Sequence, residues 1–519
     1  MDTDMDMDTD MGMATRCSVP ILAAFGAVLG MMAPTALAGD WQIVPSISVN
    51  ETATDNVGQV KKHRENDWIT DIAPGIKING RGDRLSLSFD YQLHGLHYAN
   101  DSSRNNFQNS LNAMGTLEAL ENWFFIDASA MISQQNLSAF SGSTYSSVDT
   151  NNSDNRVETA TYQIAPYFRG TLGASTEYLL RYNLSRTTSD GNNARNAKTR
   201  QLVGRLASTK EFSRFGWSLD ANSQKDDFEQ GRSTESDLVR GTLTYRIVPQ
   251  LRASLIAGRE SNDYTSLNKE SHTIKGAGFE WTPTERTLLA ASYEDRFFGD
   301  SNSITFTHRT PGTAWKYTQT KDVYTSTDQS SGSVGTYFGL LDSMFSSAIP
   351  DPVARAAYVN AMLQNSGISP NASLQGGFLT TGVTLQKRKE LSLALVGARN
   401  TVTFAATRSE NQDISNGTGS GWFLGTDFSN LESIKQTGAS VNWSHNLSGL
   451  STLTGSASRL KNKGSGSSSV HTDETMYTVN FLTRLGPKTS AGLGVRRIEV
   501  DGSTSYTENA LTGTFSHQF

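Results

Sequence analysis

The chain has 519 residues, of which 36% are hydrophobic and 18% are charged, and its formal net charge is −6. No apolar stretch beyond residue 38 is long enough for a transmembrane helix, so the sequence excludes a helical membrane protein. The nearly balanced charge argues against nucleic acid as a partner. Strands with one apolar and one polar face stay compatible with this composition, because the two faces average to a polar hydropathy.

The first 38 residues have the order of a secretory signal peptide. Arg16 precedes an apolar run over residues 19–32, and a cleavage site of small residues follows at Ala36-Leu37-Ala38. Because five aspartates precede Arg16, Met13 is an alternative start of translation. Without the leader, which carries five Asp and one Arg, the formal charge is −2.

Residues 39–519, which we predict as one mature domain, alternate apolar and polar side chains. In residues 85–93 every odd position is apolar and every even position is polar. This period of two is typical of strands with one face against an apolar medium and one face in water. The same alternation recurs at residues 178–185, 217–221, 239–247 and 477–481.

Short and long connections alternate between these strands. The short ones lie at residues 80–83, 121–122, 173–175, 248–250, 283–285, 398–400 and 486–487, and the long polar ones at 136–155, 188–197, 226–233, 411–430 and 462–472. Short periplasmic turns and long extracellular loops are typical of outer-membrane barrels, and the spacing indicates about 22 strands, with roughly 18 to 24 allowed. We therefore predict an all-β fold: a closed antiparallel transmembrane β-barrel in the outer membrane of a Gram-negative bacterium.

The C-terminus supports the closed barrel. The last residues alternate in the manner of a strand and end on an aromatic side chain, with Phe515 and Phe519 as the candidate residues for barrel closure and assembly. A last strand must pair with the first to remove the sheet edge, and a terminal aromatic fits the interfacial girdle. The departure from this pattern is His517, where an apolar residue is more usual.

Residues 332–370 interrupt the alternation. Asp351 can cap a helix that has Pro352 at its first position, and Gly367 can end it. Because the strand before the insertion is expected to run outward, this helical insertion is predicted to be extracellular. It either fills the lumen or covers its own apolar face.

If the apolar face of each strand is outward, arginines outnumber acidic residues on the inward face. Such a lining favours anionic solutes or polysaccharides, whereas the alternative is cross-strand ion pairing that fills the interior. The candidate lumen-lining residues are Arg169, Arg181, Arg205, Arg240, Arg246, Arg252, Arg484 and Arg496, and the inward acids are Asp90, Asp127, Asp220, Glu280 and Glu294.

No catalytic motif accompanies these features. The chain has no G-x-S-x-G, P-loop, H-E-x-x-H or paired C-x-x-C sequence. His94 and His97 point to opposite faces of one strand, which is a poor geometry for a metal. Acidic loop residues at 149–154 and 226–227 could hold calcium, but solvated loop tips are the preferred interpretation. We predict a protein without catalytic activity, cofactor or metal.

Several motifs resemble the PEP-CTERM system-associated outer membrane proteins. They are the opening from Trp41 to Asn56, His308-Arg309-Thr310-Pro311, the Asp351-Pro352-Val353-Ala354-Arg355 sequence and residues 377–381. The resemblance implies an outer-membrane barrel linked to exosortase-associated exopolysaccharide production. It supplies no active-site residues.

The expected function is a hydrated pore for exopolysaccharide export or surface display. The alternatives are a structural or docking barrel without transport and a barrel-embedded hydrolase. Because the first strand begins near Trp41, directly after the leader, we do not expect a separate plug domain. Expected partners are outer-membrane lipid, the barrel assembly machinery, exopolysaccharide and periplasmic export components.

Overall fold

The computed structural model describes residues 39–519, except for several segments. These are residues 142–147, 152, 154, 191–195, 210–213, 230–231, 325–337, 339–340, 343–344, 346–348, 350–354, 357, 361–382, 415–426, 429–430 and 468. The predicted signal peptide therefore lies outside the described residues. No helix in the described part of the chain is long and apolar enough to span a membrane.

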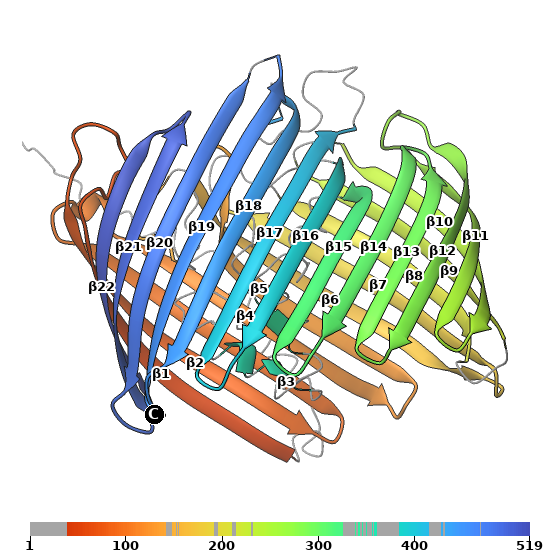
Figure 1. Cartoon of the computed structure of the whole chain (residues 1–519), viewed down its shortest axis with the longest axis horizontal. Coiled ribbons are helices and arrows are strands. Elements are labelled where there is room, and N and C mark those ends of the chain that lie inside the picture. Colours follow the sequence, from red (N-terminus) through yellow and green to blue (C-terminus); the bar gives the residue numbers. More distant parts are fainter. Residues whose placement is uncertain are drawn as a thin grey trace, which may run out of the picture.

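Twenty-two antiparallel strands form one closed sheet, which confirms the predicted fold and strand number (Figure 1). Each strand pairs with the next along the chain, and β1 also pairs with β22. The strands are β1 Gly39–Thr54, β2 Asp67–Gly82, β3 Leu85–Tyr98, β4 Asn106–Leu120, β5 Phe124–Asn136, β6 Arg156–Leu172, β7 Thr176–Ser189, β8 Ala197–Ser208, β9 Phe215–Phe228, β10 Thr234–Val248, β11 Leu251–Asn262, β12 Glu270–Thr284, β13 Thr287–Arg296, β14 Gly299–Arg309, β15 Thr313–Tyr324, β16 Thr384–Val396, β17 Asn400–Asp413, β18 Leu431–Asn446, β19 Ser451–Gly466, β20 Val470–Arg484, β21 Thr489–Gly502 and β22 Tyr506–Gln518.

The outward face of the sheet is apolar and solvent-exposed. On β7, for example, Leu180, Tyr182 and Leu184 are exposed and alternate with the inward-facing Arg181 and Asn183. A soluble protein would bury such side chains, whereas lipid covers them in an outer-membrane barrel. The apolar outer face and the closed ring therefore make this chain an outer-membrane β-barrel.

The seam between the first and last strands explains the C-terminal sequence. β1 and β22 pair from Ser46 with Gln518 to Thr54 with Ala510. The backbone N–H of Phe519 then donates to the carbonyl of Pro45 at 2.9 Å, and the ring of Phe519 is exposed. Phe515 is also exposed on the outer face. Both aromatics therefore lie at the seam, and their role in barrel closure and assembly stays a prediction.

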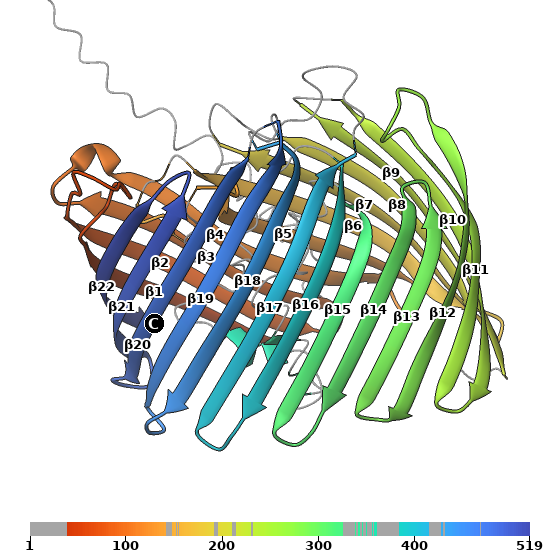
Figure 2. The ribbon, with the colours of Figure 1, turned by 45° about the horizontal axis from the view of Figure 1, so that its top comes forward.

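One rim carries only short turns in the part of the chain that the structure describes, as predicted (Figure 2). The other rim mixes long loops with tight turns at residues 297–298 and 503–505 and with the short link between the ends of β19 and β20. The predicted loop over residues 462–472 is therefore wrong, because β19 and β20 continue through it as a hairpin. Polar side chains are compatible with a strand that projects beyond the lipid, where both faces meet water.

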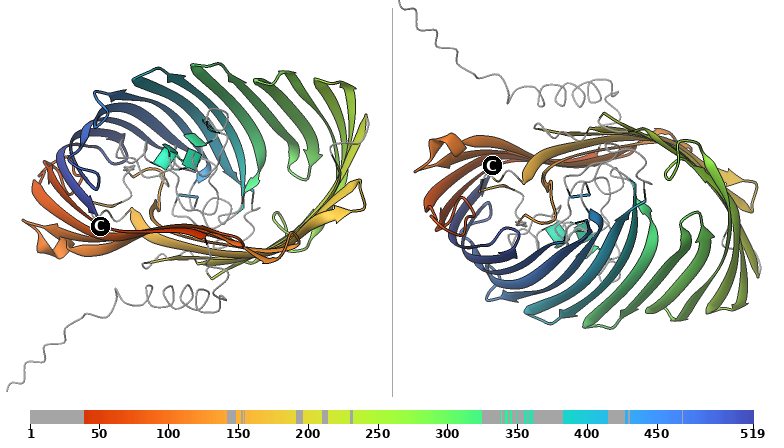
Figure 3. Two further views of the ribbon diagram at one scale, coloured as in Figure 1. Left: turned by 90° about the horizontal axis from the view of Figure 1, so that it is seen from below. Right: turned by 90° about the horizontal axis from the view of Figure 1, so that it is seen from above.

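Parts of the 332–370 insertion lie inside the ring of strands, where both end-on views show their teal segments (Figure 3). Helical residues are described at 355–356 and 358–360, near the predicted helix. The ring of Phe345 packs edge-on against Tyr358, and Arg355 donates to Asp342 at 2.8 Å. Asp351, Pro352 and Gly367, which were predicted to delimit the helix, fall outside the described residues.

Candidate functional site in the barrel lumen

The described residues of the long connection between β5 and β6 contact inward-facing side chains of other strands. We call its described residues, 137–141, 148–151, 153 and 155, the crossing segment. Its base is a hairpin, because the backbone N–H of Leu137 donates to the carbonyl of Asn155 at 2.7 Å. From this base the chain makes two contacts with inward-facing side chains of distant strands. The first lies on β19 and β20, the second on β2 to β4.

The first anchor holds residues 138–140. Asn462 on β19 hydrogen-bonds the carbonyl of Ala139, and Thr472 on β20 donates to the carbonyl of Phe140 at 2.7 Å. Asp427 accepts hydrogen bonds from the Ser138 hydroxyl at 2.6 Å and the Ala139 N–H at 2.7 Å. Seven strands separate β5 from β19 by the shorter way around the ring. The crossing segment therefore links two distant parts of the barrel wall.

An apolar cluster reinforces this first anchor. Ala139 and Phe140 are buried against Leu431 and Ile434 of β18. Burying a phenylalanine side chain stabilises the contact by about 1.5–3 kcal/mol. Hydrogen bonds and apolar contacts therefore both hold residues 138–140 at the first anchor.

The second anchor holds residues 148–151. Val148 packs into a buried cluster with Tyr98 and Leu96 of β3. The Tyr98 hydroxyl donates to the carbonyl of Thr150 at 3.0 Å, and the side-chain amide of Gln108 bridges both backbone groups of Asp149 at 2.9 and 3.0 Å. All these inward residues lie near the outer ends of β3 and β4, so the second anchor lies at the extracellular end of the lumen.

Burial changes the chemistry of the Asp149 carboxyl group. Loss of solvation raises its pKa above the usual 3.8, although the nearby Arg156 and the backbone N–H groups of Ser153 and Asn151 oppose this shift. The ionised carboxylate is therefore less favourable in the docked segment than in water. Docking of the crossing segment is coupled to this proton.

Five of the eight predicted lumen arginines are ion-paired on the inward face. Such cross-strand ion pairs are what the alternative to an anion-binding lining expected, and the role of these arginines as a lumen lining stays a prediction. The pairs are Arg181 with Asp127 at 2.6 Å, Arg205 with Asp220 at 3.3 Å, Arg240 with Glu294 at 2.8 Å, Arg252 with Glu280 at 3.2 Å and Arg496 with Glu508 at 2.9 Å.

The Arg240–Glu294 pair spans two intervening strands. Arg240 lies on β10 and Glu294 on β13, and Gly258 and Gly276 lie between them on β11 and β12. A Cβ atom at Gly276 would come within 2.9 Å of Glu294 Cγ, and one at Gly258 within 3.4 Å of Arg240 Cβ. The two glycines therefore leave the space that the long side chains occupy.

The other three arginines have no acidic partner among the described residues. Arg169 lies over the ring of Phe125, with 4.2 Å between the guanidinium carbon and the ring centroid. No hydrogen bond or ion pair of the described residues involves the side chains of Arg246 and Arg484. All three lie toward the periplasmic ends of their strands. Of the eight predicted arginines, these three are the ones that no acidic side chain of the described residues holds.

A buried polar cluster on β1 to β3 is the place where enzyme chemistry would be sought. Asp71 accepts a hydrogen bond from Asn50 at 3.0 Å and lies 3.0 Å from His94 Nδ1. His94 Nε2 has no hydrogen-bond partner in the described part of the chain, so no nucleophile is placed against it. Among the described residues no group of His, Cys, Asp and Glu has the geometry of a metal site.

The crossing segment is the feature that sequence reasoning missed. Its residues were assigned to an ordinary extracellular loop because they are polar and lie between two strands. The signal that could have been noticed is Ala139-Phe140 and Val148, apolar residues inside a polar loop. Which walls these residues reach could not be deduced, because their partners are distant in sequence.

Solved structures that resemble this one include siderophore receptors and an iron transporter. The siderophore receptor PirA from Acinetobacter baumannii is 9% identical with a TM-score of 0.49, over 92% of this chain and 80% of that one. The ferric enterobactin receptor from Pseudomonas aeruginosa is 11% identical, with a TM-score of 0.47 over 93% and 82%. The FrpB iron transporter from Neisseria meningitidis is 10% identical, with a TM-score of 0.48 over 92% and 82%. These likenesses concern the fold alone.

No protein-family model matches the chain, and the search of curated proteins gives no match. The resemblance to the PEP-CTERM system-associated proteins therefore stays a hypothesis about function. The barrel architecture that it implies agrees with the structure.

Proposed function

We propose that this barrel is a hydrated conduit for anionic solutes across the outer membrane, and that exopolysaccharide is the polymer it serves. The observation that carries the proposal is the set of unpaired arginines, Arg169, Arg246 and Arg484, on the inward face near the periplasmic rim. Inward cations attract anions into a pore and set its selectivity. The sequence resemblance supports export or surface display of an extracellular polymer, with periplasmic export components as partners.

The crossing segment supplies the constriction of this conduit. It is anchored by hydrogen bonds and apolar contacts near the extracellular end, so it narrows the path without taking part in the closure of the sheet. Its two anchors are separate contacts, and release of one would leave the hairpin base intact. Passage of a polymer then requires the segment to move aside.

Conductance in planar bilayers tests the conduit. Because Leu137 and Asn155 already form a hairpin base, residues 138–154 can be replaced by an Asn-Gly turn, which suits a two-residue hairpin. We expect the shortened barrel to assemble and its conductance to exceed that of the intact chain. A matched control keeps the loop length and changes only Thr472→Val, which removes one hydrogen bond of the first anchor and should have a smaller effect.

Ion selectivity tests the role of the free arginines. Arg246→Glu combined with Arg484→Glu should shift preference from anions toward cations. Arg205→Gln, which changes an arginine held by Asp220, should shift it less. Equal shifts would show that pairing does not decide which arginines act on solutes.

A docking barrel without transport is the second candidate, because the buried anchors of the crossing segment favour a closed lumen. Absence of conductance in both the intact and the shortened barrel would leave docking as the better function. Turnover of lipid or polysaccharide that depends on His94 would instead support a hydrolase.

A further inference from the structure

One sector of the outer surface carries an excess of positive charge. We call the outward-facing basic side chains of β16 to β19 the basic patch. The acidic side chain of Glu410 lies between them on the same face. They share the face of Leu391 and Phe404, which is exposed to lipid. The patch consists of Lys387, Lys389, Arg408, Lys435, Arg459, Lys461 and Lys463.

The basic patch lies just beyond the apolar band of the barrel. On β16, the next outward-facing residue from Leu391 in the direction of the extracellular end is Lys389. On β17, Arg408 lies two outward-facing positions beyond Phe404, and the residue between them is Ala406. In an outer-membrane barrel this level corresponds to the headgroups of the outer leaflet. The patch is therefore placed at the height of lipid phosphate groups.

At two places in the patch, directly opposite residues on neighbouring strands carry the same charge. Lys389 is opposite Arg408, and Lys435 is opposite Lys463. None of these four side chains has a hydrogen-bond or ion-pair partner in the described part of the chain. Like charges directly opposite each other destabilise a sheet. An anion between them would remove this repulsion.

Neighbouring acids neutralise only part of the patch. Lys387 pairs with Glu410 at 3.2 Å, and Asp473 on β20 pairs with Arg459 at 2.6 Å and Lys461 at 3.1 Å. The two like-charged neighbours stay outside these pairs. Glu410 is also directly opposite Lys435 in the register of β17 and β18, so Lys389, Arg408 and Lys463 are the cations of these pairs that face no acid.

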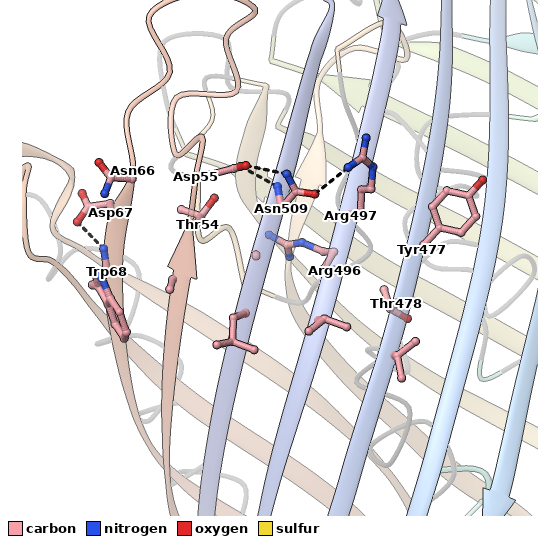
Figure 4. A pocket seen from close by; sticks show the side chains of 15 residues that line it. Thr54, Asp55, Asn66, Asp67, Trp68, Tyr477, Thr478, Arg496, Arg497 and Asn509 are labelled. Atoms are coloured by element: carbon pink, nitrogen blue, oxygen red, sulfur yellow. Dashed lines mark hydrogen bonds between the residues drawn. The ribbon is translucent and has the colours of Figure 1, made fainter.

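An apolar groove begins on β20, the strand that pairs with β19 at the edge of the patch, and Figure 4 shows the side chains that line it. It has a volume of about 550 Å³ and lies across the seam, between Trp68 of β2 and Tyr477 of β20. Val495 and Leu511 form its exposed apolar lining, and Ala53 adds little bulk. Such a groove on the lipid-facing side matches an acyl chain.

We propose that the basic patch binds the phosphate groups of an anionic glycolipid of the outer leaflet, with one acyl chain in the adjacent groove. A phosphate group neutralises the positive charges that face each other in the patch, and lysine and arginine are the side chains that recognise phosphate. The groove explains why the ligand is a lipid rather than free phosphate. This site is on the outer surface and does not depend on transport through the lumen.

Native mass spectrometry of the full, detergent-solubilised barrel with bisphosphorylated lipid A measures this binding. Lys389→Gln combined with Arg408→Gln should weaken it roughly 25-fold, since each basic residue at a lipid surface contributes roughly fivefold, or about 1 kcal/mol. Arg259→Gln combined with Lys275→Gln is the matched control. These two outward cations lie on β11 and β12 outside the patch, and their loss should have little effect.

Three results would overturn the proposal. The first is an equal loss of binding in the control variant. The second is undiminished binding of lipid A from which both phosphates have been removed, and the third is binding of inorganic pyrophosphate as tight as that of the lipid. Ala53→Trp should weaken lipid binding by filling the groove. Unchanged binding in this variant would show that the acyl chain does not lie in the groove. Heat-dependent gel mobility verifies that each variant is folded.

Discussion

Breaking the Arg240–Glu294 pair is the sharpest test of how the lumen is stabilised. In Glu294→Ala, the guanidinium of Arg240 loses its 2.8 Å partner while it is still two-thirds covered. Removing one partner of a fully buried pair costs about 3–5 kcal/mol. Because Arg240 is one-third exposed and joins Glu294 through a single contact, we expect the free energy of unfolding to fall by about 2–3 kcal/mol.

Urea titration of the barrel in lipid vesicles, followed by tryptophan fluorescence, measures this free energy. Arg246→Ala is the control, since that arginine has no side-chain partner among the described residues, and it should change stability by no more than about 0.5 kcal/mol. The exchanged variant Arg240→Glu with Glu294→Arg should recover part of the loss. The reasoning fails if Glu294→Ala and Arg246→Ala cost the same.

Three further predictions concern topology, docking and assembly. Trypsin added to intact cells should cut after the exposed Lys61 or Arg64 in the β1–β2 loop but not after Arg84 in a periplasmic turn, and cleavage at Arg84 alone would invert the orientation. Because burial raises the pKa of Asp149, docking of the crossing segment should be strongest below about pH 4 and weaken as the pH rises through that raised pKa. Hydrogen exchange should show this dependence and its loss in Asp149→Asn. Deleting Phe519 removes a seam hydrogen bond and should lower the yield of heat-modifiable barrel, whereas a normal yield would argue against its assembly role.

The barrel itself could be predicted from the sequence. Strict alternation fixes which side chains face lipid, and short turns fix the neighbours of each strand, because both are local properties of the chain. Phe519 and the alternation before it also indicated the last strand, although its register against β1 required the structure. Polar residues misled the prediction at 462–472, because a strand that extends beyond the membrane has no apolar face to signal it.

The side-chain contacts inside the lumen depend on tertiary structure and could not be predicted from the sequence. Sequence placed the arginines on the inward face, but pairing such as that of Arg240 with Glu294 depends on reach across β11 and β12 and on the space left by Gly258 and Gly276. The contact of Phe140 with Thr472 joins residues that are far apart in the chain. Alternation is a property of neighbouring residues, whereas these contacts depend on ring closure, which brings distant strands within hydrogen-bonding distance across the interior.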